Sequence, residues 1–340
     1  MLSDFIKYDS DDLLKITDSL PEDSEQALIN SIKYSENYEN ISNIVIFGMG
    51  GSCISGDLFK SYLYSKSEIP IIVNRNDILP NFVNEKSLCI FLSYSGNTYE
   101  TLSCYKQAIE KKSNYIVITR GGDLEKIALE NNHKIIKISG TLKMPRAAIG
   151  DLFYSLIGVL SKIELLNINL DEVKASFKFL KKIRDNENYK NNSKMLELAQ
   201  KIKNKNLIIF GTSPLTEFIA LRWKNQLNEN SKVTAIFNSF PELTHNEIVN
   251  LTQTDLKNSF IIVLRDKSES DFIKKQVDVT LNMFNETTIE NIFVDRESFF
   301  ERQIALVYLG DYFSIYHALI NGINPTPIKA IITLKEKMKE

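Results

Sequence analysis

Short, continuous runs of apolar and β-branched residues alternate with stretches of helical spacing along the first half of the chain. Runs without polar alternation are typical of parallel strands that are covered on both faces. The repeated order of strand, helix and strand predicts right-handed crossovers and a doubly wound parallel sheet. The runs are NIVIFG (Asn43 to Gly48), IPIIVN (Ile69 to Asn74), SLCIFLSYS (Ser87 to Ser95), YIVITR (Tyr115 to Arg120) and KIIKIS (Lys134 to Ser139).

The same rhythm restarts in the second half, after a long helical region over residues 147–205 whose middle is too polar for a core. NLIIFG (Asn206 to Gly211) repeats the opening strand and its glycine. This pattern predicts two tandem doubly wound parallel-sheet α/β domains, residues 1–152 and 153–340, the second ending in a C-terminal helix. Such sheets bind ligands at the carboxyl ends of their strands. The further strand-like runs are SKVTAIFN (231–238), SFIIVLR (259–265) and IENIFVDR (289–296).

The composition narrows the class of protein. The 340 residues are 43% hydrophobic and 25% charged, the balance of a water-soluble globular enzyme. A net charge of -2 leaves no basic excess for nucleic acid, and no apolar run approaches the length of a membrane span. The N-terminus lacks a secretory signal pattern, so we expect a cytoplasmic protein. Cys53, Cys89 and Cys104 share no CxxC spacing, which predicts reduced, mostly buried thiols and neither a metal site nor a cofactor.

A glycine-rich turn, GMGGSCISGD from Gly48 to Asp57, directly follows the first predicted strand and precedes a helical stretch. The amide groups at the start of that helix would face an anion or a hydroxyl group. The turn lacks the lysine of a P-loop and the third glycine of a dinucleotide fingerprint. Tight packing of the backbone would explain the glycines equally well.

The segment SYSGNT, Ser93 to Thr98, is more informative, because it places three hydroxyls around Gly96 where a strand gives way to a helix. Three hydroxyls together with helix amides fit a phosphate dianion, whereas ordinary helix capping needs one hydroxyl. We therefore predict that this segment and the glycine turn bind a phosphorylated small molecule. The predicted contacts are Gly51, Ser52, Ser93, Ser95 and Thr98.

These motifs also resemble a known family. FLSYSGNTYETL is similar to the phosphate-binding signature of sugar isomerase (SIS) domains, and two such domains in tandem suit the duplicated pattern. Over nearly its whole length, the chain resembles the bifunctional phosphoglucose/phosphomannose isomerase family. The further motifs that carry the resemblance are GMGGSCISGD, MPRAAIGDL (Met144 to Leu152), NQLNENSK (Asn225 to Lys232), NSFPELTHNEIV (Asn238 to Val249) and INPTPIKAIITLKEKM (323–338).

The resemblance implies that separate residues carry out the steps of an aldose-ketose isomerisation. Such a reaction opens the sugar ring, moves a proton between C2 and C1, and stabilises the charge of an enediolate. By resemblance, Glu229 is the base, His245 opens the ring, and Arg146 holds the enediolate oxygen. The residues alone leave a surface glutamate and a structural salt bridge open as alternatives. The family also implies a homodimer, in which the histidine can come from the other subunit.

The other two histidines have simpler interpretations. His133 lies in the polar stretch NNHK, where we expect a solvated side chain. His317 lies in the apolar helical run YFSIYHALI, which favours a packed core residue over a catalytic one.

The resemblance also implies roles for residues near the C-terminus. A lysine there would assist ring opening, and the family pattern points to Lys335, with Lys329 as the alternative. A threonine at the position of Thr326 is associated with accepting mannose as well as glucose stereochemistry at C2, although helix capping would also explain it. The chain departs from the family at Cys53, where alanine is common, and at Met144, where proline is common. Neither departure removes a catalytic group.

Three other functions are alternatives to the isomerase, and each would need a further sequence feature. A non-catalytic sugar-phosphate sensor usually adds a basic DNA-binding helix-turn-helix, and nothing of that kind precedes Asn43. A glutamine-dependent glucosamine-phosphate synthase needs an N-terminal cysteine nucleophile, and Cys53 lies too deep in the first fold. A dinucleotide enzyme would carry an acidic residue where Asn74 stands. We therefore expect a metal-free isomerase of glucose 6-phosphate and mannose 6-phosphate acting through a cis-enediol, with the sensor as the alternative.

Overall fold

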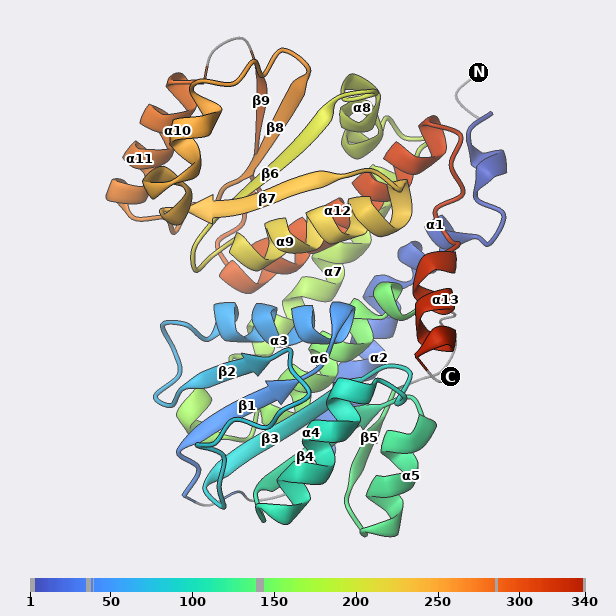
Figure 1. Ribbon diagram of the computed structural model, residues 1–340, viewed down its shortest axis with the longest axis vertical. Helices are drawn as coiled ribbons and strands as arrows, with labels where there is room; N and C mark the ends of the chain where they lie inside the picture. The colour runs from blue at the N-terminus through green and yellow to red at the C-terminus, as the bar shows by residue number, and fades with distance from the viewer. Residues whose placement is uncertain (1–3, 35–37, 39, 139–143, 285–286, 339–340) are drawn as a thin grey trace. The chain divides into compact units, whose positions relative to one another are not determined.

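The computed structural model describes residues 4–34, 38, 40–138, 144–284 and 287–338 (Figure 1). They form two compact units. The N-terminal unit comprises residues 19–181 and 296–303, and the C-terminal unit comprises the described residues of 1–18, 182–295 and 304–340. The predicted domain boundary between residues 152 and 153 falls inside helix α6 (Ile149–Leu160) and stays a prediction.

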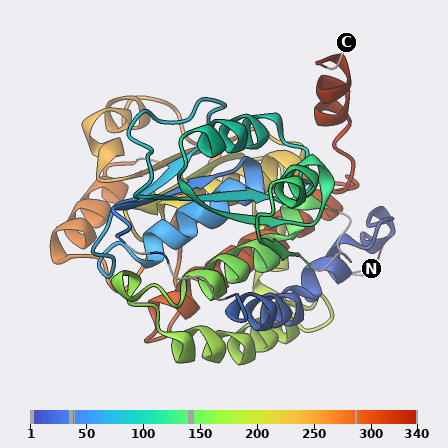
Figure 2. The same cartoon turned by 90° about the horizontal axis from the view of Figure 1, so that it is seen from below.

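The N-terminal unit contains a five-stranded sheet in the order β2-β1-β3-β4-β5, and all pairings among its described residues are parallel. The predicted doubly wound parallel sheet is therefore confirmed. Helices α4 and α5 cover one face, while α2, α3 and α6 cover the other (Figures 1 and 2). The strands are β1 (Asn43–Phe47), β2 (Ile71–Asn74), β3 (Ser87–Ser93), β4 (Asn114–Thr119) and β5 (Ile135–Lys137); Ser139, the predicted end of the last one, lies outside the described residues. The helices are α2 (Leu20–Ile32), α3 (Gly50–Tyr62), α4 (Tyr99–Glu110), α5 (Gly122–Glu130), the 3-10 turns η2 (Pro145–Ala147) and η3 (Glu164–Leu166), α6, and α7 (Leu170–Glu187), which continues into the other unit.

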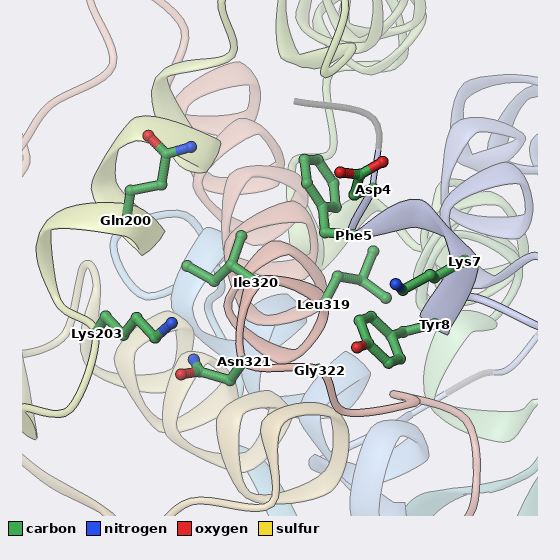
Figure 3. Close-up of a pocket in the computed structure, with 10 residues that line it drawn as sticks. All are labelled: Asp4, Phe5, Lys7, Tyr8, Gln200, Lys203, Leu319, Ile320, Asn321 and Gly322. Atoms are coloured by element: carbon green, nitrogen blue, oxygen red, sulfur yellow. The ribbon is translucent and has the colours of Figure 1, made fainter. Parts of the chain in front are cut away.

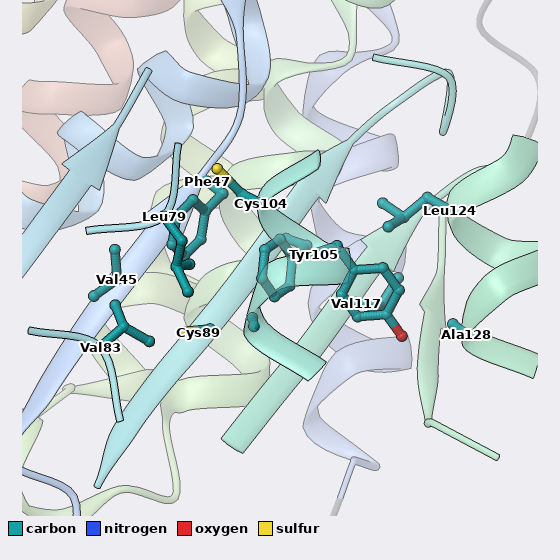
Figure 4. Close-up of a cluster of buried hydrophobic side chains, with 12 residues drawn as sticks. Val45, Phe47, Leu79, Val83, Cys89, Cys104, Tyr105, Val117, Leu124 and Ala128 are labelled. Carbon is teal, nitrogen blue, oxygen red and sulfur yellow. The ribbon is translucent and has the colours of Figure 1, made fainter. Parts of the chain in front are cut away.

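One hydrophobic core cluster of this unit lies between the sheet and helices α4 and α5 (Figure 4). Phe47 and Phe91 face each other in register on β1 and β3, and their rings stack with centroids 4.8 Å apart. Burying side chains of this size stabilises the fold by roughly 1.5–3 kcal/mol each. The three cysteines are free and buried, as expected, and burial raises the pKa of the Cys53 and Cys89 thiols to about 12.

The C-terminal unit contains a four-stranded parallel sheet in the order β7-β6-β8-β9, which repeats the order β2-β1-β3-β4 of the first sheet. The predicted second α/β domain is therefore confirmed. Among the described residues, no helix has both the length and the apolar character that crossing a membrane requires. The strands are β6 (Asn206–Thr212), β7 (Ala235–Phe240), β8 (Ser259–Leu264) and β9 (Thr288–Ile292). The helices and turns are η1 (Ile6–Tyr8), α1 (Leu13–Asp18), α8 (Lys194–Lys201), α9 (Glu217–Gln226), the π-turn η4 (Leu227–Ser231), η5 (Glu242–His245), α10 (Glu247–Leu251), α11 (Asp271–Asn282), α12 (Phe299–Ile320, which begins in the N-terminal unit) and α13 (Lys329–Lys337).

One predicted strand is shifted in the structure. The run SKVTAIFN suggested a strand over residues 231–238, whereas β7 begins only at Ala235. The preceding helix α9 continues into the π-turn η4, which ends at Lys232 in the left-handed conformation. Ser231 belongs to that turn because its hydroxyl donates to the backbone oxygen of Ser314, 2.7 Å away. A tertiary contact thus overrides the local strand pattern.

The expectation that His133 is solvated is wrong. Its Nδ1 lies 2.5 Å from the Tyr105 hydroxyl, and its ring lies 4.0 Å from that of Tyr115, centroid to centroid. The chain turns back toward the sheet after α5, because the amide of His133 donates to the carbonyl of Ala128. The polar sequence around His133 therefore marks a turn whose histidine packs inward on two aromatic rings.

His317 is a core residue, as expected. It lies on α12, is 3% exposed, and its ring packs against Phe313. Burial lowers the pKa of its imidazole to about 4, because a charged ring would lose its hydration.

This shift predicts a pH dependence of stability. Between about pH 6.5 and pH 4 the unfolded chain takes up a proton that the folded chain does not, so the free energy of unfolding falls with the pH, by about 3 kcal/mol for this group. We expect His317→Gln to remove this part of the loss. The test compares urea unfolding of the two proteins across that range. If the free energy of unfolding falls equally with pH in both proteins, the assignment to His317 is contradicted.

Candidate functional site

The glycine turn and the SYSGNT segment lie side by side at one edge of the N-terminal sheet. Strands β1 and β3 are adjacent and parallel, with Phe47 opposite Phe91, so both end at the same edge. Gly48 follows β1 immediately, and a Cβ at this position would lie 3.0 Å from the carbonyl oxygen of Leu92 on β3. A glycine is needed there for so close an approach. The two motifs that the sequence suggested separately therefore form one carboxyl-edge surface, between the starts of α3 and α4.

The hydroxyls of this surface are not used for ordinary capping. The N-cap residues of α3 and α4 are Met49 and Thr98, and neither side chain accepts a hydrogen bond from its helix. The Ser93 hydroxyl instead donates to Oγ1 of Thr98 at 3.2 Å and accepts from the amide of Gly96 at 3.1 Å. The capping alternative for Thr98 is thus wrong. The arrangement is compatible with a phosphate, but phosphate contact by these residues stays a prediction.

Gly96 fixes the shape of the segment. Its φ of +69° lies in the left-handed region, and a Cβ there would lie 1.6 Å from the carbonyl oxygen of Gly121. The carbonyl of Gly96 accepts from the amide of Leu124 at 2.9 Å, which ties the segment to the start of α5. Only glycine lets the loops after β3 and β4 approach so closely.

We expect Gly96→Ala to destabilise the protein by clearly more than Gly50→Ala. Gly50 also has a positive φ, +52°, but a Cβ there would meet no atom within 4 Å. The control variant thus carries only the conformational cost, roughly 1–2 kcal/mol, while Gly96→Ala adds a collision with the backbone. Chemical denaturation of both variants measures the difference. If both variants lose the same free energy of unfolding, the close approach of Gly96 to Gly121 does not contribute to stability.

Two arginines belong to this edge of the N-terminal unit. Arg146 lies in η2 and is 5% exposed, and η2 approaches the glycine turn, since a Cβ on Gly51 would lie 3.6 Å from the Cα of Arg146. Arg120 follows β4, and its guanidinium lies 5.7 Å from the centre of the Tyr94 ring. An open pocket of about 390 Å³ at this edge is lined by Tyr94, Ser95, Arg120, Gly121, Gly122 and Pro145.

Arg120 and Tyr94 were missed in the sequence. Arg120 ends the run YIVITR, whereas Tyr94 lies inside SYSGNT. Because parallel strands end at a common edge, the end of YIVITR predicts Arg120 beside SYSGNT. Tyr94 has no such signal as an aromatic residue among serines, yet it lines the pocket.

In the C-terminal unit, Glu229 lies in the π-turn η4 and is half-buried. The preceding helix is held rigidly: the Arg222 guanidinium forms a buried bidentate pair with Asp311, at 3.1 and 2.8 Å. The turn is also anchored, because the Asn230 side chain donates to the Ser314 hydroxyl at 2.9 Å. Both partners lie on α12, so Glu229 is presented by a turn with little freedom to move.

The C-terminal PTP stretch (residues 325–327) lies next to this turn. The Lys232 ammonium donates to the carbonyl oxygens of both Glu229 and Pro325, the latter at 2.8 Å. This contact brings Thr326 into the neighbourhood of the turn. The N-cap of α13 is Ile328 rather than Thr326, and no side chain caps the helix. Capping of α13 by Thr326 is therefore excluded, and its substrate contact stays a prediction.

The two candidate lysines occupy different faces of α13. Lys329 is its first residue and Lys335 lies near its end, and both are exposed. Six residues along an α-helix rotate a side chain by about 120° from the starting direction and advance it by roughly 9 Å. The two side chains therefore leave α13 in different directions, and Lys335 stays the preferred prediction with Lys329 as the alternative.

His245 lies far from Glu229 within the chain. Glu229 precedes the start of β7, whereas His245 ends η5, just after the carboxyl end of β7. Helix α9 packs on β6 and β7 and returns the chain to the amino end of β7 (Figure 1). A six-residue strand spans roughly 17 Å. The structure thus places Glu229 at the amino end of β7, away from the carboxyl edge where such sheets bind ligands, and one copy of the C-terminal unit does not bring the two predicted catalytic residues together.

A second pocket, of about 560 Å³, lies in the C-terminal unit, where η1 meets the end of α12 (Figure 3). Its lining includes Lys7, Tyr8, Gln200 and Lys203, and none of the predicted site residues. Within the described part of the chain, no three His, Cys, Asp or Glu side chains are grouped so that they could hold a metal ion.

Two families of known proteins match the two halves of the chain separately. The SIS domain family matches residues 38–149, and the family described as "Bacterial phospho-glucose isomerase C-terminal SIS domain" matches residues 191–338. A bifunctional phosphoglucose/phosphomannose isomerase from Caldicellulosiruptor bescii is 38% identical over 333 residues, covering 95% of this chain and 97% of that protein. The chain belongs to the bifunctional phosphoglucose/phosphomannose isomerase family. The resemblance read from the motifs is thereby confirmed.

Another relative extends the match within this family. A bifunctional phosphoglucose/phosphomannose isomerase from Aquifex aeolicus is 35% identical over 302 residues, covering 87% of this chain and 90% of that protein. Among solved structures, the C-terminal domain of glucosamine-fructose-6-phosphate aminotransferase from Francisella tularensis is similar with a TM-score of 0.70 at 18% identity, covering 92% of this chain and 97% of that one. At this level of identity, the similarity establishes the fold and nothing more.

Proposed function

We propose that this protein is an isomerase that interconverts glucose 6-phosphate and mannose 6-phosphate with fructose 6-phosphate. Its relatives with 32–38% identity carry the name of that activity. The structural observation that supports the proposal best is the surface where the SYSGNT hydroxyls, the glycine turn and Arg120 converge at one sheet edge. A surface of this kind suits a sugar carrying a phosphate dianion.

The phosphate would bind to the N-terminal unit. The hydroxyls of Ser52, Ser95 and Thr98 donate to its oxygens, as do the first amides of α3 near Gly51. Ser93 donates to the phosphate in place of its hydrogen bond to Thr98. These groups make no chemical change themselves. They hold the sugar by the end that does not react, which leaves C1 and C2 to the catalytic side chains.

The proton transfer would depend on Glu229. Its carboxylate takes the proton from C2 of the open-chain aldose, a cis-enediol forms between C1 and C2, and the proton returns to C1 to give the ketose. Arg146 stabilises the negative charge on the enediolate oxygen. Lys335 assists ring opening, with Lys329 as the alternative, and Thr326 contacts the sugar near C2, where the two aldoses differ.

His245 would act in a homodimer. Because Glu229 and His245 lie at opposite ends of β7 in one chain, we assign ring opening at one Glu229 to His245 of a second copy of this chain. An imidazole suits this role, since it can donate and accept a proton near neutral pH. We also place the enzyme in the cytoplasm, where sugar phosphates are metabolised.

The test is the formation of fructose 6-phosphate from glucose 6-phosphate and, separately, from mannose 6-phosphate, with purified protein in the presence of a chelator. We expect turnover of both substrates. If neither reacts while the protein binds them, the protein is the non-catalytic sensor that the domain type also allows. Turnover that disappears with the chelator and returns with a metal ion would contradict the metal-free mechanism.

A further inference from the structure

The two sheets can be aligned residue by residue at their central strands. Asn43 pairs with Ser87 in the first sheet, and Asn206 pairs with Ser259 at the same point of the second. Further along, the pair Phe47 and Phe91 corresponds to the pair Phe210 and Val263. The duplication predicted from the sequence thus extends to the register of the strands.

The alignment continues through the loop that follows. Counting on from β3 and β8, the segment Ser93 to Thr98 falls opposite Arg265 to Ser270. Thr98 and Ser270 are the N-cap residues of α4 and α11, so the two loops also end at equivalent points. RDKSES in the C-terminal unit is therefore the structural counterpart of the phosphate segment SYSGNT.

In RDKSES, the side chain of Glu269 occupies the place where the phosphate is predicted to bind at SYSGNT. Glu269 is 4% exposed, and its carboxylate accepts hydrogen bonds from Arg265, at 2.8 to 3.1 Å from Nη2 and Nε. It also accepts from the backbone amide of Asp266 at 2.9 Å and from the hydroxyl of Thr212, at the end of β6, at 3.2 Å. A guanidinium fork, a backbone amide and a hydroxyl are the groups that proteins use to bind oxyanions.

The corresponding residue of the first unit points elsewhere. Asn97, which aligns with Glu269, is exposed, and its side-chain oxygen accepts from the amide of Asp123 at 2.9 Å. Asn97 therefore does not fill the edge between β1 and β3, whereas the Glu269 carboxylate fills the edge between β6 and β8. A buried carboxylate is costly unless its partners compensate it fully, and Glu269 has such partners on both oxygens.

We propose that the C-terminal unit contains an oxyanion site, equivalent to the phosphate site of the first unit, which Glu269 occupies as a built-in ligand. Removal of the carboxylate opens this site to a small oxyanion such as formate, acetate or inorganic phosphate. In the intact chain, the closed site leaves the sugar phosphate one binding edge instead of two. The consequence for the sugar phosphate rests on the proposed function, whereas the oxyanion site itself is tested without any sugar.

The test is chemical rescue of Glu269→Ala. We expect its thermal midpoint to fall by roughly 10 °C, because Arg265 loses its buried partner and keeps only the exposed carboxylate of Asp278, 3.1 Å from Nη1. Formate should restore about 3–5 °C at ten times its Kd, and more than chloride at equal ionic strength. The change in thermal midpoint that each anion causes in the unaltered protein is subtracted. This subtraction corrects for anions that bind to the N-terminal unit. If Glu269→Ala needs an added anion to fold, its refolding yield in formate against chloride replaces the thermal midpoint.

Two further variants separate a site from an ordinary salt bridge. Glu269→Gln keeps the volume filled and should show no rescue. Glu301→Ala breaks another nearly buried carboxylate, 4% exposed and 2.9 Å from Arg296, which does not lie at a strand edge equivalent to the phosphate site. We expect formate to stabilise Glu269→Ala alone. Rescue of Glu301→Ala to the same degree, or no rescue of Glu269→Ala by formate, acetate or phosphate, would overturn the proposal.

Discussion

Glu229→Gln is expected to lower kcat for the isomerisation of glucose 6-phosphate by roughly two to four orders of magnitude. Glutamine has the same shape as glutamate but cannot take the proton from C2. The turn that presents residue 229 is held by Asn230 and Lys232 through contacts that do not involve the Glu229 carboxylate. The substitution should therefore leave the fold and the affinity for substrate nearly unchanged. Steady-state kinetics and a thermal melt of the same preparation measure both effects.

A second glutamate of the same unit is the control. Glu242 is exposed in η5, three residues before His245, and its side chain accepts a hydrogen bond from Asn246. Glu242→Gln removes a carboxylate without touching the proposed proton transfer, so kcat should change less than about threefold, as is usual for surface substitutions. If Glu229→Gln keeps full activity, Glu229 is not the base.

Mixing two inactive variants should restore activity if His245 acts across a dimer. Glu229→Gln lacks the base, and His245→Ala lacks the ring-opening group. In a mixed dimer, one site carries both substitutions, while the other combines Glu229 of one chain with His245 of its partner and is intact. Random exchange of subunits then gives about a quarter of the activity of the unaltered protein, because half of the dimers are mixed and each has one intact site.

The controls for this experiment lie in the variants themselves. Each variant incubated alone under the same exchange conditions should stay inactive. The double variant mixed in equal amount with the unaltered protein should fall from about half to about a quarter of full activity, because its mixed dimers have no intact site. No gain on mixing, with exchange shown by two differently tagged chains, would mean that Glu229 and His245 act within one chain. That result would require the separation along β7 to change when the substrate binds.

The sequence alone determined much of this protein, where the deciding physics is local. Continuous β-branched runs such as Asn43 to Gly48 are typical of a parallel sheet covered on both faces, so they predicted the doubly wound sheets and the duplication. SYSGNT predicted a phosphate-binding segment because it places three hydroxyls where helix capping needs only one, and the phosphate contact stays a prediction. The roles of Glu229 and His245, in contrast, came from resemblance to a family, since a glutamate in a polar turn has no local signature.

The tertiary structure decided which of these residues lie together, because proximity depends on the path of the chain between them. Helix α9 returns the chain to the amino end of β7, which separates Glu229 from His245, and no local pattern encodes that return. His133 turned inward because two tyrosines from other elements were there to pack against it. Glu269 lies in the polar stretch RDKSES, and only the register of β6 with β8 shows that it takes the position of Asn97 in SYSGNT and fills its own strand edge.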